Sequence, residues 1–198
     1  MRDSKTWDAN HDRVGATDNF VTSTPFSEIA KYHEIETPHD MRVMEIGVGD
    51  GQATRDLAAL NNEVVAIDIS EVALAKVREC AYESYLTEYL ATAYPVDLAF
   101  CHLVMQHNDQ YEVARIINDV PLKPEGMLSF QFASLNPEKT KLPPQILRDI
   151  NECMLHYYSP RKIAEIVANT NKRIDKIIGP RWFQEASFDW YIVHAVNR

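Results

Sequence analysis

Hydrophobic and polar positions alternate along most of this chain as they do in proteins built from βαβ units. From residue 41 onward, short apolar runs are separated by amphipathic stretches. Parallel strands buried on both faces give such runs, and the helices that cover them give the amphipathic stretches. The apolar runs predict strands over 42–46, 63–67, 96–101, 127–132, 173–178 and 190–196. The amphipathic stretches predict helices over 51–60, from 71 onward, over 110–118 and over 160–169. The chain is therefore predicted to have an α/β fold.

Capping residues support three of these helix starts. Ser70 precedes the helix at 71, Asp109 and Glu112 form a capping pair, and Ser159 stands before Pro160. Each has a side-chain oxygen that can accept a hydrogen bond from a free N–H of the first turn. The apolar positions expected after residue 71 include Val72, Ala75 and Val77.

The segment from 80 to 95 fits more than one interpretation. A strand is expected here, at either 82–86 or 85–89, but the preceding helix can also extend through it. Further along, Pro124, Glu125 and Gly126 predict a turn into the strand at 127–132.

The first 40 residues form an extension before the first strand. Within it, Pro25 can open a helix that carries Phe26, Ile29 and Ala30 on one face and ends before Pro38. A length of 198 residues suits one domain with a substantial core better than two domains and a linker. We expect a single domain over 1–198, with the extension at 1–40 as a possible lid on the core at 41–198.

Composition narrows the function classes. The formal charge of −9 disfavours a nucleic-acid partner, because such partners are bound mainly through Lys and Arg. No apolar run approaches the roughly 20 residues that span a bilayer, and the polar N-terminus lacks a signal peptide's apolar core. A cytoplasmic protein is expected. Cys80, Cys101 and Cys153 are widely spaced and predicted to be buried thiols, and no compact spacing of ligands predicts a metal site.

A glycine-rich loop follows the first predicted strand. It reads Glu45-Ile46-Gly47-Val48-Gly49-Asp50-Gly51, with a predicted helix directly after it and Asp68 at the end of the second strand. Glycines allow close approach of the backbone to a ligand, and the helix that follows presents free N–H groups. A carboxylate at the end of the second strand can accept hydrogen bonds from two ribose hydroxyls. Together these features predict an adenosine-binding crevice, although a glycine-rich loop can also be a simple turn and Asp68 an ordinary strand-end carboxylate.

The spacing of the glycines separates two classes of adenosine-binding protein. The dinucleotide fingerprint requires its third glycine one residue later, where this chain has Gln52. With its acidic residue, its G-x-G-x-G loop and its acid after the second strand, the chain resembles the class I S-adenosylmethionine-dependent methyltransferases. The segments at 95–100, 102–107, 122–128 and 158–160 and the hairpin around Trp190 also resemble this family. The resemblance covers residues 41–198 and implies a three-layer, doubly wound and mostly parallel seven-stranded sheet that ends in an antiparallel hairpin.

The resemblance also implies a cofactor, S-adenosyl-L-methionine, and the residues that bind it. Gly47, Val48, Gly49 and Gly51 would line the cofactor, Asp68 would hold its ribose and Ile69 would pack on its adenine. Glu45 and the backbone at Cys101 and His102 would face its amino acid end. Glu88 is a candidate for the acid that binds the adenine amino group in this family.

The expected reaction is direct transfer of the methyl group to an oxygen or nitrogen of a small-molecule acceptor. His107 and His102 are the catalytic candidates, because a histidine at the carboxyl end of the sheet can take the acceptor's proton, though both can equally be structural. His156, Tyr157 and Tyr158 are candidates for the acceptor pocket, and Trp7 and His11 for a lid or for a clasp on the core. Phe130, Phe132, Trp182 and Trp190 are predicted core residues. Two alternatives remain: a non-catalytic cofactor-binding sensor or partner subunit, and a nicotinamide-dependent oxidoreductase.

Overall fold

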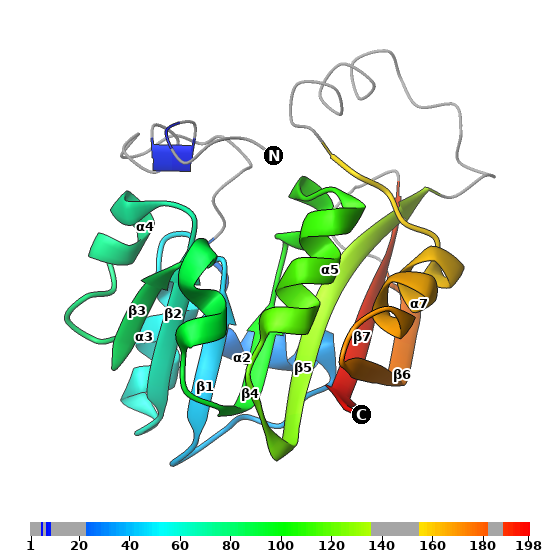
Figure 1. Cartoon of the computed structure of the whole chain (residues 1–198). Coiled ribbons are helices and arrows are strands. Elements are labelled where there is room, and N and C mark those ends of the chain that lie inside the picture. The colour runs from blue at the N-terminus through cyan, green and yellow to red at the C-terminus, as the bar shows by residue number, and fades with distance from the viewer. Residues whose placement is uncertain (1–4, 6, 9–22, 136–154, 182–187) are drawn as a thin grey trace.

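The computed structural model describes residues 5, 7, 8, 23–135, 155–181 and 188–198. They form a seven-stranded sheet in the order β3-β2-β1-β4-β5-β7-β6 (Figure 1). The strands are β1 Arg42–Ile46, β2 Glu63–Asp68, β3 Glu83–Leu86, β4 Val96–Cys101, β5 Leu122–Leu135, β6 Lys172–Arg181 and β7 Phe188–Asn197. The pairs among β1 to β5 are parallel, and β7 runs antiparallel to both of its neighbours. The predicted fold class is therefore confirmed, with β7 inserted between β5 and β6.

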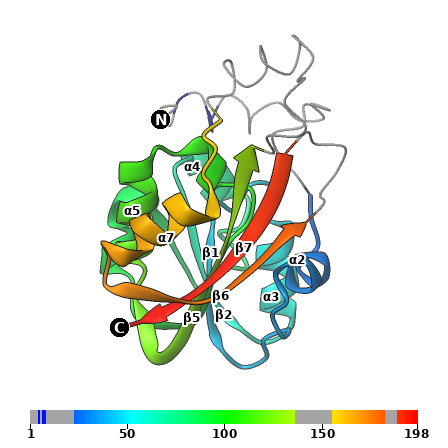
Figure 2. The ribbon, with the colours of Figure 1, turned by 90° about the vertical axis from the view of Figure 1, so that its right-hand side faces the viewer.

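Helices cover both faces of the sheet (Figure 2). On one face lie α2 Phe26–His33 and α3 Gln52–Ala59, and on the other lie α5 Gln110–Asp119 and α7 Pro160–Ala168. The short helices are α4 Glu71–Ala75 and two 3₁₀ helices, η1 Thr87–Thr92 and η2 Met105–His107. Each face has its own apolar cluster: Phe26, Leu57 and Phe100 belong to one, and Ile117 and Phe130 to the other. The three-layer architecture follows from this burial on both faces.

The chain order reverses beside β1, which lies between β2 and β4. In open α/β sheets, ligands bind outside the carboxyl ends of the strands at such a reversal. The glycine-rich loop leaves β1 at this point, so the topology places it where a ligand crevice is expected.

The predicted caps are found, with one change in detail. Ser70 Oγ accepts from Ala73 N, and Asp109 accepts from the backbone N–H groups of Tyr111 and Glu112. Glu112 does not complete a reciprocal capping pair and instead binds Arg115. The Arg115 guanidinium offers it a charge-assisted contact that a backbone N–H does not.

The helix after Ser70 differs from the prediction. It ends at Ala75, and its buried residues are Ala73 and Leu74, followed by Val77, whereas Ala75 is exposed. Of the three apolar positions expected there, Val77 is buried just beyond the helix, whereas Val72 is half-buried and Ala75 exposed, because five residues are too short for a helical period to determine which side is buried.

Two further segments resolve the ambiguous predictions. A strand over Glu83–Leu86 confirms the first of the two candidates in the 80–95 segment. The predicted turn at 124–126 is part of β5, where the register with β4 shifts between the pairs Val96↔Leu122 and Leu98↔Met127. The extra residues form an irregularity within β5. Pro124, Glu125 and Gly126 have the composition of a turn, and this composition does not distinguish a turn between elements from an irregularity within a strand.

The N-terminal extension packs on the core through α2. Phe26, Ile29 and Ala30 are buried as predicted, and His33 is fully buried at the end of the helix. Phe130, Phe132 and Trp190 are core residues, while Trp182, His11 and Cys153 lie outside the described residues. None of the helices in the described segments has the length and apolar character needed to cross a membrane.

Candidate functional site

The glycine-rich loop turns tightly over the end of β1. Gly47 has a φ of +85°, and a Cβ atom at this position would overlap the Val104 side chain. The Gly47 N–H donates to the Ile67 carbonyl at 2.7 Å, which ties the loop to β2. Only glycine accommodates both this backbone conformation and this packing.

Asp68 ends β2 beside the loop. Its carboxylate accepts from the N–H of Gly49 at 3.3 Å and from that of Ser70 at 2.9 Å. The side chain is 6% exposed and lines the same cavity as the loop. One carboxylate therefore fixes the loop and the start of α4 and also faces a ligand space.

Glu45, on β1, lines the same space. It is buried and accepts a hydrogen bond from Thr54 Oγ1 of α3. Burial, with the nearby Asp68 and Asp50 carboxylates, raises the pKa of Glu45 to about 8, against the effect of the Thr54 hydrogen bond. A cationic group placed beside Glu45 would offset this burial and favour the ionised carboxylate.

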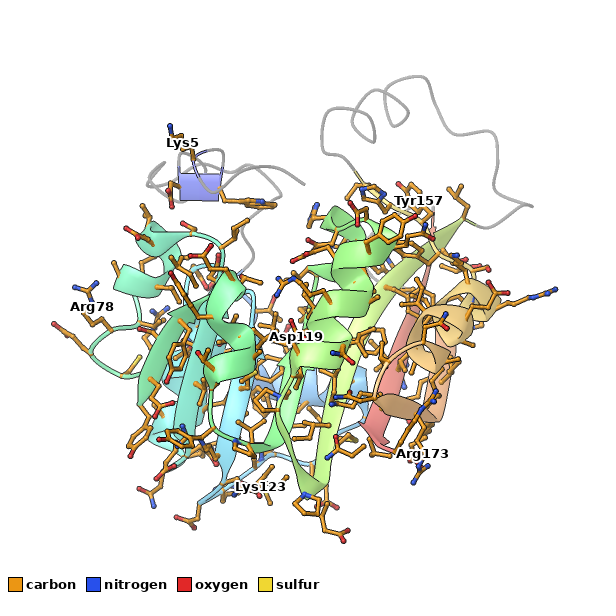
Figure 3. The ribbon with its side chains drawn as sticks, viewed as in Figure 1. Lys5, Arg78, Asp119, Lys123, Tyr157 and Arg173 are labelled. Atoms are coloured by element: carbon orange, nitrogen blue, oxygen red, sulfur yellow. The ribbon has the colours of Figure 1, made fainter. Side chains whose placement is uncertain are left out.

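A cavity of about 880 Å³ opens over the carboxyl ends of the strands. This volume lies in the upper part of the range of roughly 300–1,000 Å³ typical of small-molecule sites. Seven carboxyl side chains and two cationic ones, Lys5 and Arg115, line it; the acids are Asp8, Glu45, Asp50, Asp68, Glu71, Glu88 and Glu112. Figure 3 shows Lys5 above this end of the sheet, whereas Lys123 and Arg173 lie at the opposite end. The cavity is therefore lined mainly by acidic residues among its charged groups.

Part of the N-terminal extension reaches across the cavity. Asp8 accepts from the Ser70 hydroxyl at 2.6 Å, and the Trp7 ring lies edge-on to that of His107 with centroids 5.3 Å apart. Trp7 and His107 both line the cavity. The extension thus contacts the core on both sides of the opening.

Most predicted site residues come together here. Glu45, Gly47, Val48, Gly49, Asp68, Ile69, His102 and His107 line the cavity. Gly51 and Cys101 are not among its described lining residues. Gly51 instead is the N-cap residue before α3, and Cys101 is fully buried in β4. A loop glycine and a strand-end residue look alike in sequence whether they face a ligand or the core.

The tyrosines before α7 lie elsewhere. Tyr157 is at the same end of the sheet as Lys5 (Figure 3), but His156, Tyr157 and Tyr158 are not among the described residues that line the cavity. Tyr158 is buried and donates to the Asn108 carbonyl at 2.7 Å, so it packs the chain against η2.

Several lining residues were not predicted from the sequence. Leu86 and Thr87 line the cavity together with Glu88 after β3, and Glu112 and Arg115 do so from α5. Arg115 pairs with Glu112 and donates to the Thr87 carbonyl at 3.4 Å, which connects the two segments. No motif marks these positions, because their place in the site depends on how α5 packs beside β3.

Comparison with known proteins agrees with this geometry. Residues 44–130 match the family model described as a methyltransferase domain. No curated protein matches the chain. Among solved structures, magnesium protoporphyrin IX methyltransferase from Synechocystis PCC 6803, with bound S-adenosylhomocysteine, has 17% identity and a TM-score of 0.60 over 87% of this chain and 81% of that one.

Two further structures show the same fold. The glycopeptide N-methyltransferase MtfA has 15% identity and a TM-score of 0.64 over 91% of this chain and 93% of that one. Geranyl diphosphate C-methyltransferase from Streptomyces coelicolor A3(2) has 13% identity and a TM-score of 0.64 over 87% and 79%. The methyltransferase-domain match over residues 44–130, the 3-2-1-4-5-7-6 sheet and the glycine-rich loop at the chain reversal show that this chain has the fold of the class I S-adenosylmethionine-dependent methyltransferases.

Proposed function

We propose that this chain methylates an oxygen or nitrogen atom of a small-molecule acceptor by direct displacement. The observation that carries the proposal is that the glycine-rich loop with Asp68 lines the same cavity as Trp7, His102 and His107. Its volume suits two small ligands side by side. Its carboxyl groups disfavour a polyanionic acceptor such as DNA or RNA.

The residues present fit S-adenosylmethionine. Asp68 would hold the ribose hydroxyls, Ile69 and Glu88 would face the adenine, and Gly47 and Gly49 would approach the cofactor with their backbone. Glu45 would face the amino acid end, where a positive charge stabilises its ionised form. When bound, the cofactor supplies a methyl group on a positively charged sulfur, which a lone pair on oxygen or nitrogen can displace.

The chain's own contribution to the chemistry is positioning and exclusion of water. Trp7, held over the cavity through Asp8, would shield the acceptor, and the walls at His102 and His107 would orient it. His107 would take the proton from a hydroxyl acceptor, whereas a neutral amine needs no base before transfer. His102 is the second proposed catalytic residue.

Two observations weigh against the alternative functions. An open cavity beside the cofactor loop is unlike a silent subunit whose acceptor pocket is filled by side chains. The position of β7 between β5 and β6 differs from the strand order 3-2-1-4-5-6 of dinucleotide-binding enzymes.

The test is a transfer assay with methyl-deuterated S-adenosylmethionine. Pools of hydroxyl-bearing and amine-bearing small molecules, and separately DNA and RNA, are incubated with the protein and followed by mass spectrometry. We expect the label on a small molecule, with the transfer lost in Asp68→Ala and retained in Asp175→Ala, a control on β6 outside the lining residues. Label found only on nucleic acid, or on a carbon atom of the product, would refute the proposal.

A further inference from the structure

The turn that follows β4 has a residue in an unfavourable backbone conformation at the cavity. Leu103 has a φ of +58°. This left-handed region crowds the Cβ atom of an L residue, and residues with bulky side chains seldom adopt it. Leu103 and its neighbours His102 and Val104 all line the cavity. Strain of this kind persists only where surrounding contacts hold it, and it is concentrated at functional sites.

A buried glutamine on β5 holds this turn. The Leu103 N–H donates to Oε1 of Gln131 at 3.1 Å. Because an N–H can only donate, the amide oxygen of Gln131 and not its nitrogen faces Leu103. Gln131 is fully buried, and it is not among the described residues that line the cavity. An apolar side chain of the same size at this position would leave the Leu103 N–H without this acceptor.

The same turn reaches the glycine-rich loop on the other side of β4. The Val104 side chain occupies the space beside Gly47 in which a Cβ atom would lie. The Val104 carbonyl accepts from the N–H of His107 at 2.9 Å and from Asn108 Nδ2 at 2.9 Å. In the sheet, β4 lies between β1 and β5. The turn therefore connects β5 with the loop after β1 and with η2, which carries His107.

We propose that Gln131 is a positioning residue for the binding of S-adenosylmethionine. It holds Leu103 in the left-handed conformation, and the turn in this form packs Val104 against Gly47 and places the Leu103 side chain in the cavity wall. A glycine would adopt the turn without strain but would contribute no side chain to the wall, so the strained leucine needs Gln131. This inference rests on the proposed function, because the ligand it concerns is the cofactor proposed there.

The conformation of the turn is tested by two truncations of Leu103 in the full chain. Leu103→Ala and Leu103→Gly both remove the side chain, but only glycine adopts a φ of +58° without strain. Where φ is negative, glycine is the less stable of the two, because it loses more backbone entropy on folding. We expect the opposite order here, with Leu103→Gly unfolding at a higher urea concentration than Leu103→Ala.

The matched control is Glu165, which is exposed on α7 and is not among the described lining residues of the cavity. At this helical position, the glycine variant should unfold at a lower urea concentration than the alanine variant. If Leu103→Gly is also less stable than Leu103→Ala, the turn is not held in the left-handed conformation and the proposal is overturned.

The role of Gln131 is tested by calorimetric titration with S-adenosylhomocysteine. Gln131→Met keeps the size of the side chain and removes the acceptor. We expect the affinity to fall about three- to tenfold, the effect of one hydrogen bond, although Gln131 is buried behind the wall. In a Leu103→Gly background the turn needs no such support, so the same substitution should change the affinity by less than about twofold. Ser134→Ala, which changes a buried serine of the same strand, should bind like the wild type.

The outcomes separate this inference from the proposed function. An unchanged affinity in Gln131→Met, or an equal loss in both backgrounds, would overturn the positioning role, because a merely structural glutamine gives the same effect whichever residue occupies position 103. Absence of binding by the wild type would count against the proposed function. The order of stability of the two Leu103 truncations tests the turn independently of any ligand.

Discussion

The Asp68 carboxylate at the end of β2 accepts the N–H of Gly49 in the glycine-rich loop at 3.3 Å. The loop and the acid that the sequence places in one site are therefore coupled in the folded protein. A change at Asp68 affects the ribose site both directly and through the loop.

Asp68→Ala is expected to weaken binding of S-adenosylmethionine by about 1.5–3 kcal/mol, the usual effect of losing a hydrogen bond to a charged group. Calorimetry on the variant measures this. Asp175→Ala, which removes an exposed carboxylate of β6, should bind like the wild type. An unchanged affinity in Asp68→Ala would show that the ribose is not held there.

Gly47→Ala is expected to destabilise the fold by about 1–3 kcal/mol, because alanine is strained at a φ of +85° and its methyl group overlaps Val104. Urea unfolding measures the loss. A companion variant, Val104→Ala, makes room for the methyl group, so the double variant should recover part of the stability lost by overlap. If Gly47→Ala unfolds at the same urea concentration as the wild type, the loop does not have this geometry.

Glu45 is expected to make the protein less stable as the pH rises from 6.5 to 8. Its folded pKa of about 8 lies above its ordinary value of 4.5, so the folded state holds the proton that the unfolded state has released. Stability from this group is complete below pH 4.5 and is lost as the pH rises toward 8. The loss between pH 6.5 and 8 should be on the order of 1–2 kcal/mol. Unfolding of Glu45→Gln at both pH values should show a smaller loss, and equal losses would contradict the burial of an ionisable Glu45.

The buried histidines are expected to give the opposite dependence of folding stability on pH. The pKa of His102 is lowered to about 4 by burial, so below pH 6.5 the unfolded state takes up a proton that the folded state does not. Stability from His102 is complete above pH 6.5 and is lost as the pH falls toward 4. In a Glu45→Gln background, which removes the opposing effect, unfolding at pH 5 should need less urea than at pH 6.5. His102→Gln in the same background should reduce this difference, and the exposed His39→Gln should not.

Local sequence signals predicted the strands, the glycine-rich loop and the acid that build the cofactor side of the site. Strands such as Arg42–Ile46 and Val96–Cys101 were predicted residue by residue, because each is a short, mostly apolar segment between turn or helix signals. The loop was recognisable because its glycines, at a fixed spacing, allow a tight turn and a close approach of the backbone to a ligand. Asp68 was recognisable because it follows a strand beside that loop.

The rest of the site depends on contacts between distant segments. His33 and Ser129 are separated by 96 positions and meet only because α2 packs beneath β5. Nε2 of His33 also lies 3.2 Å from Nδ1 of His102, and no spacing in the sequence connects these two residues. Thr87 and Arg115 enter the cavity for the same reason, and the short helix after Ser70 was misjudged because tertiary packing, not its period, selected the buried residues.

Calorimetric titration with S-adenosylmethionine, S-adenosylhomocysteine and NADH, each in a separate run, tests the central claim most directly. The acidic cavity, the G-x-G-x-G loop and Asp68 predict that the two adenosyl ligands bind and that NADH does not. Binding of NADH alone, or of none of the three, would contradict the assignment of this cavity to S-adenosylmethionine.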